Sequence, residues 1–200
     1  FSKNKHEIII IDDGSNDGST NILKNCDFIK LIIQVKNKGK GAAIKKGLEE
    51  ATHNKIITFD GDMELRPLEM SRLMILDRTK NIYCALGYRF NNLNLIKSSF
   101  YWGNFIFTTF FNLTYQSCYK DSLCCAKAFY KKDLKYAKIY SNGFDIDVEL
   151  LSLLSIKNKR NHIQQIFLNY KRRSILEGKK LKISDGWKIL VRIIKTTKYF

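Results

Sequence analysis

The sequence has few of the residues that build long linkers, with one proline and eleven glycines among its 200 residues. No Pro- or Gly-rich stretch divides the chain, so a set of flexibly joined modules is excluded. Hydrophobic residues make up 44% of the chain and aromatic residues 12%, which is typical of a folded protein. A chain of 200 residues is enough for one α/β core and too short for two comfortable ones. We therefore expect a single domain over residues 1–200.

The chain also lacks the cysteine spacing of a metal site and an apolar run long enough to cross a bilayer. Its five cysteines include no C-x-x-C pair, and free cysteines in apolar segments behave as small hydrophobic residues in a reducing, cytosolic setting. A membrane-spanning helix needs about 18 apolar residues, and the longest candidate, 100–113, is interrupted by polar side chains. No signal peptide is visible at Phe1. We expect a chain that lies on a membrane without crossing it.

Acidic residues are scarce relative to basic ones, 19 against 35, which gives a net charge of +16 at pH 7. This excess favours polyanionic partners, which include nucleic acid, anionic lipid headgroups and phosphorylated substrates. The Lys-Asn-Lys runs at 3–5, 36–38 and 157–159 are equally well explained as solvated loop surface. Acid clusters that follow two of the expected strands would repel a phosphate backbone, so we expect no nucleic-acid partner.

Short β-branched runs alternate with helical patterns through the first half of the chain. The first run, 7–11, is continuous and apolar, as in a strand buried on both faces of a parallel sheet. The alternation predicts an α/β fold with a mostly parallel sheet flanked by helices. The expected strands cover 7–11, 31–35, 55–59, 82–86, 124–129 and 163–169. The expected helices cover 19–25, 42–52, a stretch opened by Pro67, 97–116, 148–156, and a last one that Ser184 and Asp185 cap and that runs to about Thr197.

Acidic residues follow the first and third expected strands directly. Asp12 and Asp13 end the first strand, and Asp60, Asp62 and Glu64 come after the third. Because ligands of open α/β sheets bind beyond the carboxyl ends of the strands, we expect both clusters to border one site. Carboxylates with this spacing are ligands that Mg²⁺ or Mn²⁺ prefers, often together with substrate phosphates. The alternative is a pair of ordinary acidic turns.

The segment 37–43 (NKGKGAA) resembles a glycine-rich loop that leads into the first turn of a helix. Backbone N–H groups and the helix dipole favour anions at such a place, and the Lys40 ammonium is expected to reach a pyrophosphate or ribose oxygen. The segment is neither a Walker motif nor G-x-G-x-x-G, which excludes the usual kinase and dinucleotide-binding loops. An ordinary strand-to-helix loop remains the alternative.

Six segments together resemble family-2 glycosyltransferases with the GT-A fold. The first three are similar to motifs of the whole family, and the last three are similar to its dolichyl-phosphate β-glucosyltransferase and dolichol-phosphate mannosyltransferase branch. The family's first strand would precede Phe1, so the resemblance implies an N-terminally truncated catalytic domain. The segments are 8–20 (IIIIDDGSNDGST), 37–47 (NKGKGAAIKKG), 57–67 (ITFDGDMELRP), 121–129 (DSLCCAKAF), 147–151 (DVELL) and 177–181 (EGKKL).

The resemblance implies an inverting, metal-dependent hexosyltransferase with Mg²⁺ or Mn²⁺ as cofactor. The implied donor is a nucleotide-sugar, UDP-glucose before GDP-mannose, and the implied acceptor is a polyprenyl phosphate. The enzyme is then expected as a peripheral protein at the cytoplasmic face of a membrane. The alternatives are transfer to a saccharide hydroxyl, which requires a general base such as Asp121, Asp145 or Asp147, and a catalytically silent relative. Relatives usually carry Gln, Gly-Phe and Trp where this chain has Leu123, Cys125-Ala126 and Tyr170.

The resemblance also assigns expected roles to individual residues. Asp62, Asp121, Lys127 and Asp147 are the expected catalytic residues, although helix capping or buried pairing explains the last three as well. Asp60, Asp62 and Glu64 are the expected metal ligands. The expected acceptor-phosphate residues are Arg172, Arg173, Lys179 and Lys180, and the expected nucleotide-binding residues are Asp12, Asp13, Gly14, Ser15, Gly39, Lys40 and Gly41.

Two segments are expected to form helices with one apolar face. In 97–116 five large side chains fall at helical spacing, and such a stripe lies either at a membrane interface or in the core. The segment 186–198 interleaves apolar with basic residues and is expected to face anionic lipid. The residues of the first stripe are Trp102, Phe105, Ile106, Phe110 and Leu113.

Overall fold

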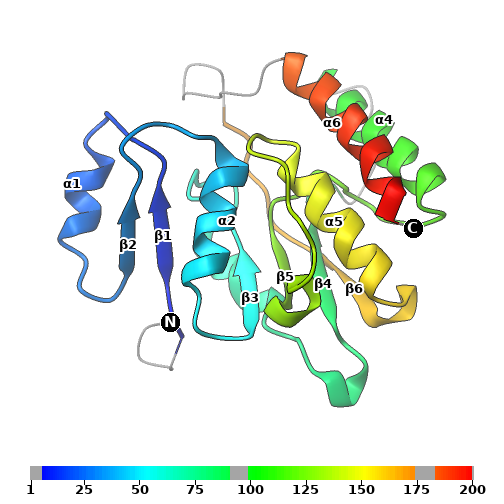
Figure 1. The fold of residues 1–200 in the computed structure, drawn as a ribbon, viewed down its shortest axis with the longest axis horizontal. Coiled ribbons are helices and arrows are strands. Elements are labelled where there is room, and N and C mark those ends of the chain that lie inside the picture. Colours follow the sequence, from blue (N-terminus) through cyan, green and yellow to red (C-terminus); the bar gives the residue numbers. More distant parts are fainter. Residues whose placement is uncertain (1–5, 91–98, 174–182, 200) are drawn as a thin grey trace.

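The strands form two sheets that lie side by side in the computed structural model, which describes residues 6–90, 99–173 and 183–199 (Figure 1). In the first sheet β1 (Ile9–Asp12) pairs in parallel with β2 (Lys30–Ile33). The second sheet has the strand order β3-β5-β4-β6. Its strands are β3 (Lys55–Thr58), β4 (Cys84–Tyr88), β5 (Lys127–Tyr130) and β6 (Ile163–Phe167).

The second sheet is mixed, whereas the sequence pattern predicted a mostly parallel sheet. β4 pairs with β6 in parallel, but β5 runs antiparallel to both β3 and β4. The direction of β5 follows from its entry point, because Lys127 at its start lies opposite Thr58 at the end of β3. The apolar pattern of a strand does not reveal its direction, so only the α/β class could be predicted, and it is confirmed.

Helices cover the sheets on the face that Figure 1 shows and at one end. α2 and α5 lie over this face, and α4 and α6 lie together beyond β4 and β6. α6 begins at Ile183, so Ser184 and Asp185 lie inside its first turn instead of capping it. The helices are α1 (Ser19–Lys24), α2 (Lys40–Glu50), α3 (Met70–Leu73), α4 (Ser99–Thr114), α5 (Ile146–Lys157) and α6 (Ile183–Thr196), with 3₁₀ turns at Pro67–Glu69, Arg78–Lys80, Lys131–Leu134, Arg160–His162 and Thr197–Tyr199.

The main core surrounds α5. Its residues from Ile146 to Leu154 are all buried, and a helix that is buried on every side belongs to the interior of a fold. Its leucines pack with Phe111 of α4, Phe129 of β5 and Ile193 of α6. α5 therefore holds the sheet and the two outer helices in one arrangement.

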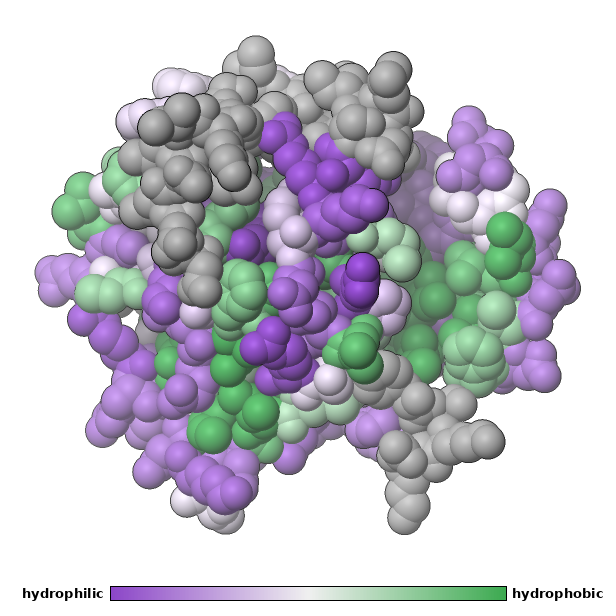
Figure 2. All heavy atoms as spheres, turned by 180° about the vertical axis from the view of Figure 1, so that it is seen from behind, coloured by the Kyte–Doolittle hydropathy of each residue, from purple (hydrophilic) through white to green (hydrophobic). Residues whose placement is uncertain are grey.

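The β1–β2 sheet is less well covered than the rest. Ile9, Ile10 and Ile11 are only partly buried, and Ile33 is 45% exposed. Figure 2, which views the molecule from behind, shows apolar side chains over this sheet while polar ones dominate the centre of the same face. No strand ladder joins β1 to β3 in the described part of the chain.

We predict that Leu154→Ala costs about 2–5 kcal/mol of unfolding free energy, because truncating a fully buried leucine removes packing and leaves a cavity. The measurement is urea denaturation followed by circular dichroism. Leu113→Ala is the matched control, since that leucine on α4 is 75% exposed and its loss is expected to change stability by less than about 0.5 kcal/mol. Equal costs for the two variants would contradict the burial of α5.

Candidate active site

The candidate site lies at the edge where β3 and β4 end and β5 begins. Thr58 at the end of β3 and Leu86 in the middle of β4 both lie opposite Lys127 at the start of β5. Asp60 and Arg89 follow these two strand ends. The expected convergence of residues beyond the carboxyl ends of the strands therefore takes place at this edge.

Asp12 organises the turn that follows β1. Its buried carboxylate accepts a hydrogen bond from Ser15 N at 2.8 Å and another from the Thr20 hydroxyl. The Thr20 hydrogen bond holds the pKa of Asp12 below its ordinary value, although burial opposes this. Asp12 and Ser15, both expected to bind the nucleotide, are thus engaged with each other inside the turn.

Asp13 joins this turn to the glycine loop. Its two carboxylate oxygens accept hydrogen bonds from Lys38 N and Gly39 N, both at 2.8 Å. Gly14 has φ +75°, and a Cβ there would lie 2.9 Å from Asn37 N, so only glycine lets the turn and the loop approach this closely. The first acid cluster and the glycine loop therefore form one unit.

The glycine loop packs against the segment 141–143 instead of presenting a free phosphate cradle. Gly41 N donates to the Asn142 carbonyl oxygen at 2.8 Å, and Ala42 N donates to the same oxygen at 3.3 Å. A Cβ at Gly39 or Gly41 would lie 2.3 Å or 2.4 Å from a backbone oxygen of that segment. Gly39 and Gly41 thus allow close packing of the loop on this segment, and their expected role in nucleotide binding stays a prediction.

Lys40 lies between two acids of the site that come from distant parts of the chain, Asp60 and Asp147. Its ammonium lies 2.8 Å from Asp60 Oδ2 and 2.7 Å from Asp147 Oδ2. Burial by itself lowers the pKa of Lys40, but the two carboxylates outweigh it, and the pKa lies well above its ordinary value. Lys40 is therefore a permanent cation that joins the acid after β3 to the first turn of α5.

Asp147 also approaches the ammonium of Lys127. Lys127 is 2% exposed, and its ammonium donates to the Cys124 carbonyl oxygen. The same ammonium lies 3.6 Å from Asp147 Oδ1, near enough for charge attraction and too far for a hydrogen bond. Burial raises the pKa of Asp147, but Lys40 and Lys127 more than compensate, so its pKa is lowered. The structure thus brings two of the expected catalytic residues together as a buried ion pair.

Asp121 is paired with Arg89, a residue that the sequence reasoning missed. Arg89 donates from Nε and Nη2 to the two Asp121 oxygens at 2.8 Å and 3.0 Å. The backbone amides of Arg89 and Leu123 also donate to Asp121, to Oδ2 and Oδ1 respectively, both at 3.2 Å. The Asp121 side chain is fully buried. The sequence could have indicated Arg89 by its position, because it directly follows the end of β4 just as the acids Asp60 and Asp62 follow the end of β3.

Asp62 and Glu64 face the segment that follows β6. Arg173 Nη2 lies 3.1 Å from Asp62 Oδ2, and Arg173 N donates to Glu64 Oε1 at 3.1 Å. The Tyr170 hydroxyl donates to Glu64 Oε2 at 3.0 Å, and the Tyr170 ring lies 5.3 Å from the Arg89 guanidinium carbon. Arg173, expected near the acceptor phosphate, is therefore in contact with the expected metal ligands.

The three expected metal ligands do not converge on one point in this structure. Asp60 faces Lys40, while Asp62 and Glu64 face Arg173. Among residues 6–90, 99–173 and 183–199 there is no group of three or more His, Cys, Asp or Glu side chains that is placed to hold a metal ion. A metal site formed by all three carboxylates therefore does not fit this arrangement. Asp60 is paired with Lys40, and Asp62 and Glu64 are in contact with Arg173.

Two further expected residues, Lys179 and Lys180, lie outside the described residues, as does the 177–181 motif. Arg172 is half-buried beside Arg173 at the same edge. Within the described ranges no helix is long and apolar enough to pass through a bilayer.

A sequence model of Glycosyl transferase family 2 matches residues 2–134. The chain belongs to this family. A human dolichyl-phosphate beta-glucosyltransferase is 26% identical over 200 residues, which cover 91% of this chain and 60% of the human protein. An undecaprenyl-phosphate 4-deoxy-4-formamido-L-arabinose transferase from Aeromonas hydrophila is 39% identical over 74 residues, which cover 34% of this chain and 23% of that protein. The chain thus spans less than two thirds of the length of these relatives.

Solved structures confirm the GT-A glycosyltransferase fold. Glucosyl-3-phosphoglycerate synthase from Mycobacterium tuberculosis, in complex with Mn²⁺, UDP-glucose and phosphoglyceric acid, superposes with a TM-score of 0.72. The superposition covers 94% of this chain and 67% of that chain at 15% sequence identity. At this identity the likeness concerns the fold alone.

We predict that Lys40→Met lowers the stability of this family-2 glycosyltransferase at neutral pH and less so in acid. The lowered pKa of Asp147 means that its charge stabilises the fold above the ordinary pKa of an aspartate, about 4. Without Lys40, burial dominates and raises this pKa, so the variant loses stability as the pH rises from about 4 to 7. The expected loss at pH 7 is about 2–3 kcal/mol, since Lys127 still compensates part of a broken buried pair.

Urea denaturation of both proteins between pH 4 and pH 7 measures this difference. Lys24→Met is the control, because Lys24 is an exposed lysine at the end of α1 and its loss is expected to leave the pH profile unchanged. A Lys40→Met difference that is the same at every pH would show that Asp147 does not depend on Lys40.

Proposed function

We propose that the chain is an inverting glycosyltransferase that moves a hexose from a nucleotide-sugar onto a polyprenyl phosphate. UDP-glucose is the favoured donor, before GDP-mannose. The family membership supports sugar transfer, and two relatives are described by their names as acting on dolichyl phosphate or undecaprenyl phosphate. The proposal also includes a divalent cation, Mg²⁺ or Mn²⁺, as cofactor.

One observation favours a phosphate acceptor over a saccharide hydroxyl: each carboxylate considered as a general base is paired with a cation. Asp121 is bound by Arg89, Asp145 by Arg192, and Asp147 by Lys40. The pKa of Asp147 lies below its ordinary value because of Lys40 and Lys127, which makes this carboxylate a poor proton acceptor, and Asp121 and Asp145 are already engaged with guanidinium groups. A sugar hydroxyl needs such a base, whereas a phosphate acceptor is already anionic at neutral pH.

The proposed reaction is an in-line displacement at the anomeric carbon of the donor. An oxygen of the acceptor phosphate forms the new bond to this carbon while the bond to the donor diphosphate breaks, and the nucleoside diphosphate leaves with the electron pair. The configuration at the carbon is inverted. Catalysis then depends on orientation and on cations near the negative charges of both phosphates. Lys40, Arg89 and Arg173 place three such cations at the edge of the sheet where the acids also lie.

Asp62 is the acid that we propose holds the divalent cation. Its oxygens contact one backbone N–H, that of Glu64, and the Arg173 guanidinium. Arg173 is a natural partner for the donor diphosphate, because guanidinium groups bind phosphate oxygens in pairs. Transfer of Arg173 from Asp62 to the diphosphate would leave the Asp62 carboxylate to a metal ion. The ion itself would neutralise charge on the leaving diphosphate.

We predict sugar transfer from UDP-glucose to a polyprenyl phosphate that requires Mn²⁺ or Mg²⁺ and is abolished by EDTA. Asp62→Asn is expected to lower the rate about 100-fold or more, which is the usual cost of losing one charge-stabilising group in an active site. Asp27→Asn, at an exposed acid in the loop before β2, is the control and is expected to keep the wild-type rate. The measurement is transfer of radiolabelled sugar, with GDP-mannose and a soluble saccharide tested in parallel.

Each part of the proposal has its own contradicting outcome in this assay. Transfer only to the soluble saccharide would contradict the phosphate acceptor. Faster transfer from GDP-mannose would contradict the donor preference. Full activity of Asp62→Asn in EDTA would contradict the metal.

We also propose that α4 and α6 place the enzyme on the cytoplasmic face of a membrane as a peripheral protein. Within the stripe on α4, Phe105 and Phe110 are partly buried, whereas Trp102, Ile106 and Leu113 are between 47% and 75% exposed. On α6 Trp187 is 71% exposed and Ile194 is 55% exposed. Lys188 and Lys195 are exposed on the same helix, and Lys198 is exposed in the 3₁₀ turn that follows it. Exposed aromatic and apolar side chains together with lysines are typical of a surface that binds anionic lipid.

We predict that Trp187→Ser combined with Ile194→Ser lowers binding to vesicles that contain anionic lipid by about 10-fold or more, because two large apolar groups no longer enter the interface. Vesicle flotation is the measurement. Phe28→Ser, at a residue 60% exposed in the loop before β2, is the matched control and is expected to bind like the wild type. Equal binding by the double variant would contradict the proposed membrane surface.

A further inference from the structure

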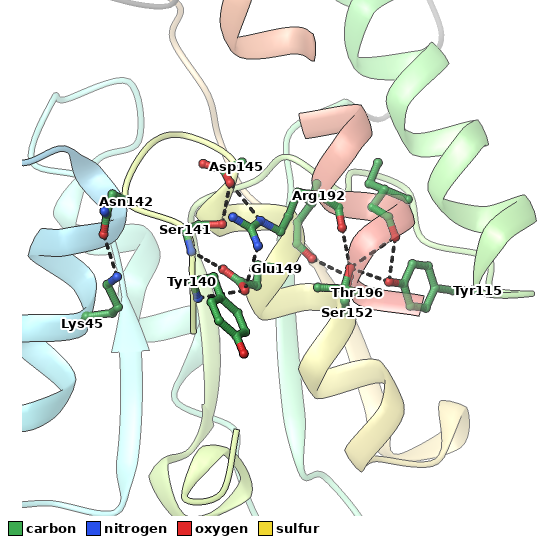
Figure 3. Close-up of polar contacts among 12 residues, drawn as sticks. Lys45, Tyr115, Tyr140, Ser141, Asn142, Asp145, Glu149, Ser152, Arg192 and Thr196 are labelled. Carbon is green, nitrogen blue, oxygen red and sulfur yellow. Dashed lines mark hydrogen bonds and ion pairs between the residues drawn. The ribbon is translucent and has the colours of Figure 1, made fainter. Parts of the chain in front are cut away.

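Arg192 on α6 forms ion pairs with two acids, Asp145 and Glu149, at the start of α5. Its Nε lies 3.0 Å from Asp145 Oδ2, and its Nη1 lies 3.5 Å from Glu149 Oε1. Figure 3 shows the guanidinium of Arg192 between these two carboxylates, which project from the start of α5. The reaction proposed above does not use this group of charges.

Glu149 in turn binds the backbone of residues 140–141, in the segment before α5. Its side chain is fully buried and accepts hydrogen bonds from Tyr140 N at 3.0 Å and from Ser141 N at 2.7 Å. Asp145 accepts a further bond from the Ser141 hydroxyl at 2.6 Å. A buried carboxylate is stable only while such donors surround it, so the position of residues 140–141 depends on the charge balance around Glu149.

The next residue along the chain contacts α2. The Asn142 carbonyl oxygen accepts from Gly41 N and Ala42 N, and its side-chain oxygen accepts from Lys45 Nζ at 2.6 Å (Figure 3). Lys40, directly before these amides, holds Asp60 and Asp147. A continuous path therefore runs from Arg192 through residues 140–142 to the first turn of α2.

We propose that Arg192 is a positioning residue that holds the glycine loop 39–41, and through it Lys40 and Asp60, in the arrangement that binds the nucleoside diphosphate of the donor. The part that concerns the donor rests on the proposed function. Arginine suits this role because its planar guanidinium contacts two carboxylates at once, whereas a lysine ammonium is a single point of charge. Because glycine at 39 and 41 leaves no space between the loop and residues 141–142, a shift of that segment moves the loop with it.

α6 is also held in place independently of Arg192. The Tyr115 hydroxyl of α4 lies 2.6 Å from Thr196 Oγ1 and donates to the Ile193 carbonyl oxygen at 3.1 Å, and Thr196 in turn contacts Ser152 of α5 (Figure 3). Ile189 and Ile193 are buried in the core. Substitution of Arg192 is therefore expected to disturb residues 140–142 without detaching α6.

The test compares Arg192→Gln, Arg192→Lys and the control Lys157→Gln, which changes an exposed lysine at the end of α5. Calorimetry measures UDP affinity, hydrogen exchange reports the amides of Gly41 and Ala42, and kinetics separate KM from kcat. For Arg192→Gln we expect UDP affinity to fall about 10-fold, the donor KM to rise by a similar factor with a smaller change in kcat, and faster exchange of the two amides. Arg192→Lys is expected to show each of these effects to a smaller extent than Arg192→Gln. The control is expected to show none of them.

Wild-type exchange and UDP affinity in Arg192→Gln would overturn the proposal. So would an equal loss in Arg192→Lys and Arg192→Gln, or a fall in kcat alone. If Arg192→Gln does not fold, Arg192→Lys decides, since intermediate exchange at Gly41 supports the proposal and wild-type exchange overturns it. If the wild-type chain binds no UDP and transfers no sugar, the proposed function fails, while amide exchange still decides whether Arg192 holds the loop.

Discussion

The arrangement of the site depends on the ammonium of Lys40, which lies between the carboxylates of Asp60 and Asp147. This contact joins three parts of the chain: the glycine loop, the acids after β3 and the first turn of α5. The side chains of Lys40 and Asp147 are only 14% and 8% exposed, and a charge in such a place needs a partner of opposite sign, whereas Asp60 is 32% exposed. The same cation therefore serves the packing of the fold and the electrostatics of the site.

Pairing of acids with cations extends over the whole edge of the sheet. Asp121 is matched by Arg89, Asp62 by Arg173, and Asp145 and Glu149 by Arg192. Because these paired charges cancel, they do not contribute to the net charge of +16, which comes from the excess of lysine and arginine over acids elsewhere in the chain. A donor diphosphate or an acceptor phosphate entering this edge would compete with carboxylates for the same guanidinium and ammonium groups.

α5 connects this chemistry to the outer surface of the protein. Asp147 and Glu149 in its first turn and Asp145 directly before it contact Lys40 and Arg192, while its leucines fill the core. α6 packs on it with one face, and its other face presents Trp187 and Ile194 to solvent. The surface proposed to meet the membrane and the loop proposed to bind the donor are thus two ends of one packed unit. A contact at one end has a direct mechanical route to the other.

The sequence by itself determined the class of the fold, the order of most of its elements and the position of the two acid clusters. These features depend on local chemistry: β-branched runs form strands, and aspartate and glycine form the turns where the strands end. The family motifs in 8–20, 37–47 and 57–67 were readable for the same reason.

The tertiary structure alone decided which charges meet. Lys40 and Asp147 are 107 residues apart, and Arg89 and Asp121 are 32 residues apart. No local pattern marks such pairs, because each depends on how strands from different parts of the chain pair and in which direction. The antiparallel course of β5 is the main example, since it brings Lys127 to the edge where β3 and β4 end. Residue types and spacing therefore predicted the chemistry of the site, whereas strand direction and packing determined its geometry.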